Sequence, residues 1–166
     1  MPHYNRSTVE GRATRRRWAM TPEQFWGVWR LISYEFRLAD GILIRPMGQG
    51  VRGLLMYDRA GYMMLQVMDP ERPLFQSGDW LKGTPDEIQS AWEGAFSYYG
   101  TFELDARRQM IIHHIQGAAF PNWIGSAREL FFEFADARLT LMTLPMPLAG
   151  EQAVGYLTWE RVEYVK

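Results

Sequence analysis

The chain has 166 residues, a formal net charge of −1 and 47% hydrophobic residues, and aromatic residues make up 14%. A chain of this length builds one domain with a substantial buried core and is too short for two. It contains no Cys, which excludes disulfides, a thiolate nucleophile and a Cys-ligated metal. No stretch approaches the roughly 20 apolar residues that cross a bilayer. We therefore expect a cytoplasmic protein with no membrane partner.

The first 20 residues are strongly basic, with five Arg against Glu10. They lack the apolar stretch and the small-residue cleavage site of a secretory signal. A basic arm of this kind suits contact with nucleic acid or anionic lipid, but the rest of the chain is acidic and continues no basic stripe. We therefore interpret residues 1–20 as a disordered extension and residues 21–166 as the folded domain. No nucleic-acid partner is expected.

The domain opens with a short helical turn that leads into a long strand. Thr21 and Gln24 frame Pro22 in the pattern of a capping box, which predicts a single turn of helix. The following segment FWGVWRLISYEF is rich in aromatic and β-branched residues and predicts a strand. By the same criteria we expect eight strands, at residues 27–38, 50–58, 61–68, 97–105, 109–117, 127–135, 138–144 and 153–163.

One helix interrupts these strands, after a second capping box at Thr84-Pro85-Asp86-Glu87. Apolar residues then recur at the spacing of one helix face, which we expect to cover an end or a flank of the domain: Ile88, Ala91, Trp92, Ala95 and Phe96. The whole pattern predicts an all-β fold, an eight-stranded antiparallel up-and-down barrel with one amphipathic helix between strands 3 and 4.

The lengths of the connections indicate where such a barrel opens. The second, fourth and sixth connections are tight turns, whereas the first, third, fifth and seventh are long. Alternate connections of an up-and-down barrel lie at the same end, so the long loops gather at the end opposite Trp29. Long loops grouped by a rigid scaffold commonly carry function. We expect a cavity to open there between residues 41–49, 69–82 and 120–125.

Strand alternation predicts which side chains face the interior. A tight turn at Ala106-Arg107 would place Gly100 opposite His113, with space beside the imidazole, on an inward face that is largely apolar. His114 would then lie on the outer wall. The expected cavity lining is Phe102, Ile111, Ile115, Leu130 and Phe132.

Several segments resemble the bacterial and fungal lipocalin-like domain family. The most specific are HHIQG at residues 113–117 and FPNWIG at residues 120–125, and the opening WRLISYE and the closing WERV are similar too. The resemblance covers nearly all of residues 25–163. It implies a calycin-type barrel for a small apolar molecule, in which Trp29 plugs the closed end and Arg161 lies over it in a cation–π contact.

The candidate ligand-binding residues combine polar anchors with aromatic faces. Arg128 has inward parity and suits a ligand carboxylate, although pairing with Glu35 is the favoured alternative. Trp123 offers a stacking face at the rim or a packing plug. The full candidate set is Gln66, Tyr98, Phe102, Asn122, Trp123, Arg128 and Phe132.

The candidate catalytic residues are Glu35 and His113. Glu35 shares strand parity with Trp29 and would face the lumen, where burial raises the pKa of a carboxyl group and suits it to acid–base work. His113 changes charge near neutral pH. The alternatives are a carboxylate paired with a neighbouring Arg, and a core histidine hydrogen-bonded to Tyr98 or to the backbone.

We expect the lumen to bind a small hydrophobic molecule, an aromatic or isoprenoid-like secondary metabolite. The alternatives are a cofactor-free isomerase, cyclase or lyase that uses the His113–Glu35 pair, and a scaffold barrel with a filled lumen. No metal is expected, because the adjacent His113 and His114 point to opposite faces of one strand. No cofactor is expected either, with haem on a single axial His as the alternative. A homodimer is left open.

Overall fold

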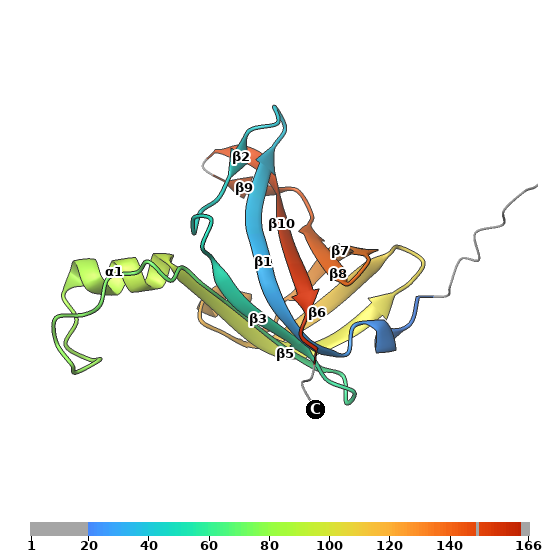
Figure 1. Cartoon of the computed structure of the whole chain (residues 1–166), viewed down its shortest axis with the longest axis horizontal. Helices are drawn as coiled ribbons and strands as arrows, with labels where there is room; N and C mark the ends of the chain where they lie inside the picture. Colours follow the sequence, from blue (N-terminus) through green and yellow to red (C-terminus); the bar gives the residue numbers. More distant parts are fainter. Residues whose placement is uncertain (1–19, 149, 164–166) are drawn as a thin grey trace, which may run out of the picture.

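The computed structural model describes residues 20–148 and 150–163, so the expected basic extension lies outside the described residues except for Met20. These residues form one antiparallel sheet that closes on itself (Figure 1). The strands are β1 (Gly27–Leu38), β2 (Leu43–Ile44), β3 (Arg52–Tyr57), β4 (Tyr62–Met68), β5 (Ala95–Asp105), β6 (Met110–Ala118), β7 (Ala127–Ala135), β8 (Arg138–Thr143), β9 (Met146–Leu148) and β10 (Glu151–Arg161). The helices are α1 (Pro85–Glu93) and the 3₁₀ turns η1 (Pro22–Gln24) and η2 (Pro121–Trp123).

The barrel closes because β1 pairs with β3 on one side and with β10 on the other. Eight strands run around the barrel, and the short β2 and β9 add to β1 and β10 near the open end. The expected all-β, eight-stranded antiparallel barrel is confirmed. The helix lies after β4, one strand label later than expected, because the short β2 precedes β3; among the eight strands that run around the barrel it follows the third.

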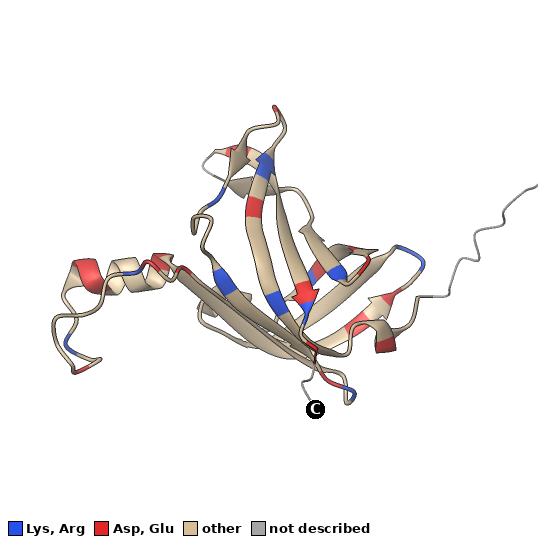
Figure 2. Cartoon of the chain, in the orientation of Figure 1, with Lys and Arg blue, Asp and Glu red and all other residues tan. Residues whose placement is uncertain are grey.

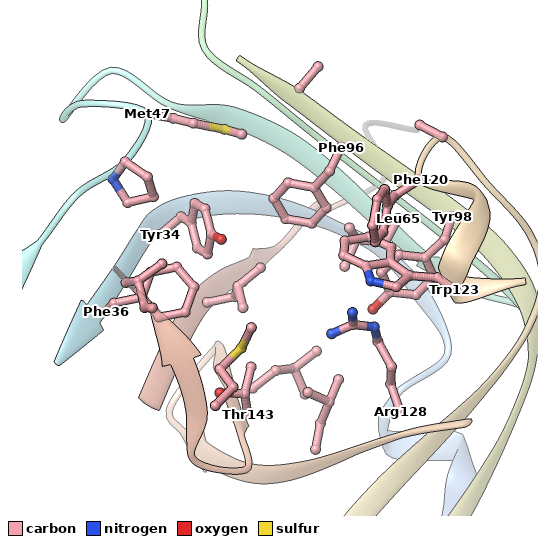
Figure 3. Close-up of a pocket in the computed structure, with 18 of the residues that line it drawn as sticks. Tyr34, Phe36, Met47, Leu65, Phe96, Tyr98, Phe120, Trp123, Arg128 and Thr143 are labelled. Atoms are coloured by element: carbon pink, nitrogen blue, oxygen red, sulfur yellow. The ribbon is translucent and has the colours of Figure 1, made fainter. Parts of the chain in front are cut away.

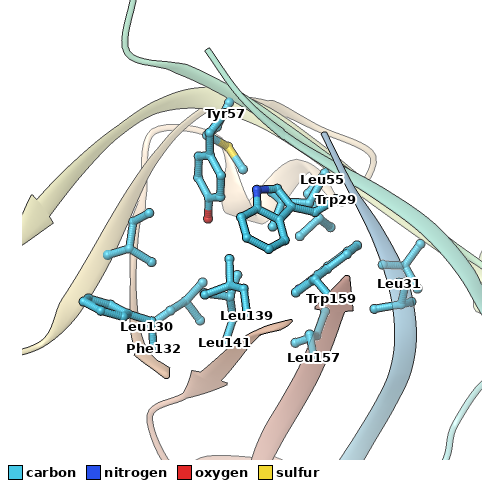
Figure 4. Packing of buried hydrophobic residues seen from close by; sticks show 14 of the residues in the cluster. Trp29, Leu31, Leu55, Tyr57, Leu130, Phe132, Leu139, Leu141, Leu157 and Trp159 are labelled. Atoms are coloured by element: carbon cyan, nitrogen blue, oxygen red, sulfur yellow. The ribbon is translucent and has the colours of Figure 1, made fainter. Parts of the chain in front are cut away.

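The closed end is packed around two tryptophans, Trp29 and Trp159, which are 1% and 0% exposed (Figure 4). The indole nitrogen of Trp29 donates a 2.7 Å hydrogen bond to the carbonyl oxygen of Phe25. The guanidinium carbon of Arg161 lies 4.1 Å from the centre of the Trp29 ring, and the same group donates to the backbone carbonyls of Gln24 and Trp26. The expected Trp29–Arg161 contact at the sealed end is therefore confirmed. The predicted η1 turn is also present, and Arg161 binds the carbonyl of its last residue, Gln24.

The helix α1 has the expected cap but does not cover the barrel. Glu87 accepts from the backbone N–H of Thr84 at 2.8 Å, and the Thr84 hydroxyl accepts from the backbone N–H of Glu87 at 3.3 Å. The helix projects from the side of the barrel (Figure 1), which leaves Ile88 and Trp92 about half exposed. It ends at Glu93, so Phe96 of the expected apolar face belongs to β5 instead.

The register between β5 and β6 differs from the expected one, by two residues from Gly100 to Asp105. Phe102 lies opposite His113, and Gly100 lies opposite Ile115. The turn is wider than expected, with Asp105 opposite Met110, and Gln109 within it adopts a left-handed conformation with a φ angle of 54°. A shift of two residues keeps every side chain on its expected face. Gly100 leaves no space beside His113, because a Cβ there would overlap the carbonyl oxygen of His114.

A bulge in β1 changes which side chains of that strand face inward. Its register against β10 shifts between Leu31 and Ser33. Leu31 is buried in the core before the bulge, and Tyr34 and Phe36 line the interior after it. The expectation that Glu35 faces the lumen is therefore wrong, because one extra residue reverses the alternation of the strand.

Charged residues of both signs are scattered over the described part of the barrel (Figure 2). None of the helices in residues 20–148 and 150–163 has the length and apolar character needed to cross a membrane.

Candidate ligand-binding site

The open half of the barrel contains a cavity of about 370 Å³ (Figure 3). It lies above the packed closed end and opens between the segment at Pro46-Met47, the start of β5 and the η2 turn. Its walls are mainly aromatic and aliphatic. The aromatic lining residues are Tyr34, Phe36, Trp92, Phe96, Tyr98, Phe120 and Trp123.

The cavity exists because several local features turn aromatic side chains toward one space. The β1 bulge brings Tyr34 inward, where its ring packs 5.4 Å from that of Phe96 at the start of β5. The Pro at the first position of η2 suits a helical turn, and the turn places Trp123 edge-on to Phe96 and Tyr98, at 6.1 and 5.9 Å between ring centres. These contacts form a continuous aromatic wall.

Arg128 supplies the charge in this wall. Its guanidinium carbon lies 3.9 Å from the centre of the Trp123 ring, and its Nε is buried without a hydrogen-bond partner. Burial lowers the pKa of Arg128, but a guanidinium stays protonated in proteins. Within residues 20–148 and 150–163, no carboxylate oxygen lies within 4.0 Å of it. The site therefore holds a partly buried cation without a counter-ion.

The expected pairing of Arg128 with Glu35 is wrong. Glu35 accepts a 2.9 Å hydrogen bond from Arg37, and its other oxygen lies 3.5 Å from Arg45. Both arginines reach it on the side of β1 that faces away from the cavity. This arrangement corresponds to the alternative of a carboxylate paired with neighbouring Arg.

His113 lies behind the cavity wall and is fully buried. Its Nε2 is 2.7 Å from the hydroxyl oxygen of Tyr57, and its Nδ1 is 3.0 Å from that of Tyr98. Burial, with a smaller effect of the Arg128 charge, lowers the pKa of His113 to about 3. The imidazole is therefore neutral at pH 7. Both ring nitrogens are engaged, so His113 is not placed to ligate haem.

The two tyrosines on the cavity wall are also kept neutral. Burial raises the pKa of Tyr34 to about 12 and raises that of Tyr98 as well, against an opposing effect of the Arg128 charge. The wall therefore presents neutral hydroxyls and one permanent cation, and the carboxyl group of Glu93 lines the cavity at the end of α1. Such a surface suits an apolar molecule that carries a hydrogen-bond acceptor.

The structure brings together three of the seven candidate ligand-binding residues: Tyr98, Trp123 and Arg128 line the cavity. Phe102 packs 4.7 Å from Tyr57, and Phe132 packs 5.0 Å from Phe25, both in the core beneath the cavity. Gln66 and Asn122 are exposed and do not line the cavity.

The candidate pair His113 and Glu35 is not assembled around the cavity, because neither side chain lines it. Of the expected cavity lining, Leu130 is correct, while Phe102, Ile111, Ile115 and Phe132 belong to the packed core. The cavity lining includes Met47 and Phe120, which come from two of the expected loops. The third expected loop, residues 69–82, does not line the cavity, and Trp92 and Ala95 line it instead.

The residues missed from the sequence are chiefly Tyr34, Phe36 and Phe96. No sequence signal marks the bulge that turns the first two inward. Phe96 could have been assigned to a strand and not to the helix, because Gly94 precedes β5 and glycine commonly ends a helix.

Comparison with known proteins gives two matches. Residues 26–162 match a family described as "Lipocalin-like domain". The 4'-hydroxy-3'-methoxypropiophenone carrier protein ppsC of Aspergillus oryzae (strain ATCC 42149 / RIB 40) is 28% identical over 107 residues, which are 60% of this chain and 96% of that protein. No solved structure matches the chain.

Proposed function

Because the chain belongs to the lipocalin-like domain family, we propose that it is a carrier that binds a small aromatic molecule in the open half of its barrel. The observation that carries this proposal is the cavity of about 370 Å³ lined by aromatic side chains. Small-molecule sites are typically concave, mostly apolar and of 300–1,000 Å³.

The aromatic class is supported by the wall formed by Phe96, Tyr98 and Trp123. Rings that meet edge-on, as these do, leave faces and edges on which a ligand ring can pack in the preferred offset or T-shaped arrangements. The name of the Aspergillus relative refers to an aromatic ketone. An isoprenoid chain would fill the same volume but would gain nothing from this ring geometry, so we favour an aromatic ligand.

The proposal is tested by filling the mouth of the cavity. Met146 lines the cavity from β9, whereas Met56 of β3 is 40% exposed on the outer wall. We expect Met146→Trp to weaken the binding of 2-acetonaphthone, measured by calorimetric titration, at least tenfold, because the larger ring occupies the ligand volume. Met56→Trp is the matched control and leaves the affinity unchanged. Equal affinities in both variants, or no saturable binding to the unaltered protein, would contradict the proposal.

A further inference from the structure

A chain of three polar side chains leads from the core to the cavity: Tyr57, His113 and Tyr98. The Tyr57 hydroxyl meets Nε2 of His113 at 2.7 Å, and Nδ1 meets the Tyr98 hydroxyl at 3.0 Å. A neutral imidazole carries one N–H, so it donates to one tyrosine and accepts from the other. The position of this single proton decides what Tyr98 offers to a ligand.

The burial of Tyr57 fixes the direction of the chain. Tyr57 is 2% exposed, and within the described residues its hydroxyl has one hydrogen-bond partner, Nε2 of His113. If Nε2 donated, the Tyr57 proton would be buried without an acceptor, which is unfavourable. Tyr57 therefore donates to Nε2, and the imidazole proton lies on Nδ1. Nδ1–H in turn donates to the oxygen of Tyr98.

Tyr98 consequently keeps its own hydroxyl proton for another acceptor. It lines the cavity, and within the described residues its hydroxyl has no hydrogen-bond partner besides His113. Arg128 lies directly across the β6–β7 pair from His113, and Figure 3 shows its guanidinium reaching toward Tyr98 and Trp123. A guanidinium has no acceptor atom and cannot take the Tyr98 proton. Tyr98 and Arg128 thus present two hydrogen-bond donors to the cavity, one of them charged, beside the hydroxyl of Tyr34.

We propose that Tyr98 and Arg128 together bind an anionic oxygen of the ligand, which is therefore an aromatic carboxylate whose ring lies along the wall formed by Phe96 and Trp123. The carboxylate would accept the Tyr98 O–H and pair with the Arg128 guanidinium that lines the cavity, and so would supply the missing counter-ion. Charge-assisted hydrogen bonds of this kind are stronger than neutral ones. This inference rests on the proposed function, since it specifies the ligand class of the same cavity.

Three probes of similar shape test the ligand class: 2-naphthoate, 2-acetonaphthone and 2-ethylnaphthalene. We expect the affinity at pH 7, measured by calorimetric titration, to fall in that order, with 2-naphthoate at least tenfold tighter than the hydrocarbon. If all three bind equally, the inference is overturned and the carrier proposal stands. If none binds, the carrier proposal itself fails.

Single substitutions test the two donors. Arg128→Met should weaken 2-naphthoate at least tenfold and leave 2-ethylnaphthalene unchanged, with Arg107→Met in the exposed β5–β6 turn as control. Tyr98→Phe should weaken both oxygen-containing probes, while Tyr99→Phe, whose ring is 54% exposed, should weaken neither. An unchanged 2-naphthoate affinity in either cavity variant would overturn the inference.

The direction of the hydrogen-bond chain has an independent test. Nitrogen-15 NMR separates protonated from unprotonated imidazole nitrogens, and we expect the His113 proton on Nδ1. A proton on Nε2 would mean that Tyr98 donates to His113 and not to the ligand, which would overturn the inference without any binding measurement.

Discussion

Two arginine–tryptophan pairs occupy opposite ends of this barrel and differ in what else the arginine contacts. Arg161 lies 4.1 Å from the Trp29 ring and donates to the carbonyls of Gln24 and Trp26. Its guanidinium therefore stabilises the closed end. Arg128 lies 3.9 Å from the Trp123 ring, but its Nε has no partner. The same cation–π contact is structural in the first pair, whereas in the second the guanidinium lines the cavity without a carboxylate partner among the described residues.

At the residue scale, His113 should make stability depend on pH. Its pKa falls from an ordinary 6.5 to about 3 on folding, so between these values the unfolded chain binds the proton more readily. Protonation then favours unfolding, and stability should fall as the pH drops from 6.5 toward 3, by up to about 1.4 kcal/mol per pH unit from this group. Urea unfolding at a series of pH values measures the slope.

Two substitutions separate His113 from the carboxylates that titrate in the same range. His113→Gln, which retains a donor and an acceptor, should flatten the slope. His114→Gln, on the exposed outer face of the same strand, should not. Identical slopes in the two variants would show that His113 does not carry the pH dependence.

At the scale of the strands, the alternation of the sequence predicted on which face of the sheet most side chains lie. It was less successful in predicting which residues pair across neighbouring strands. Side chains of β5, β6 and β7 took their expected faces because a register error of two residues preserves the pattern. The β1 bulge inserts a single residue, which reverses the alternation, so Tyr34 lies in the site and Glu35 lies outside it. Bulges depend on how neighbouring strands curve, so a single strand's composition does not reveal them.

A second bulge, in β6, gives a prediction at the scale of the strands: the pairing passes from Tyr99–Gly117 to Gly100–Ile115, which leaves Gln116 of β6 unpaired opposite Gly100. A Cβ at Gly100 would overlap the carbonyl oxygen of His114, and backbone atoms of a paired strand cannot move aside easily. Gly100→Ala should therefore destabilise the protein by about 1–3 kcal/mol, the usual range for overpacking, measured by urea unfolding.

Gly78→Ala is the matched control for this change. A Cβ at Gly78 meets nothing within 4 Å, so the substitution should be neutral or stabilise by up to about 1 kcal/mol through reduced entropy of the unfolded chain. If Gly100→Ala were as well tolerated as Gly78→Ala, the bulge would not require glycine.

At the scale of the whole molecule, the barrel divides into a packed half and an open half. The lengths of the connections correctly predicted which end opens, because that depends only on the order of the strands. The depth of the cavity was not predictable in this way. It depends on how Phe25, which follows η1, packs against Phe132 and Phe134 of β7, with ring centres 5.0–5.9 Å apart, to fill the closed half of the barrel.

This division predicts that ligand binding stabilises the whole barrel, because the cavity walls come from strands all around it. A ligand that binds only the folded state at 100 times its dissociation constant contributes about 2.7 kcal/mol. For a chain of this size that corresponds to a rise in Tm of about 5–10 °C. We expect 2-naphthoate to produce this rise in the unaltered protein, measured by calorimetric melting. In Met146→Trp, whose cavity is filled, the same concentration should leave Tm unchanged. An equal rise in both proteins would place the binding site outside the cavity.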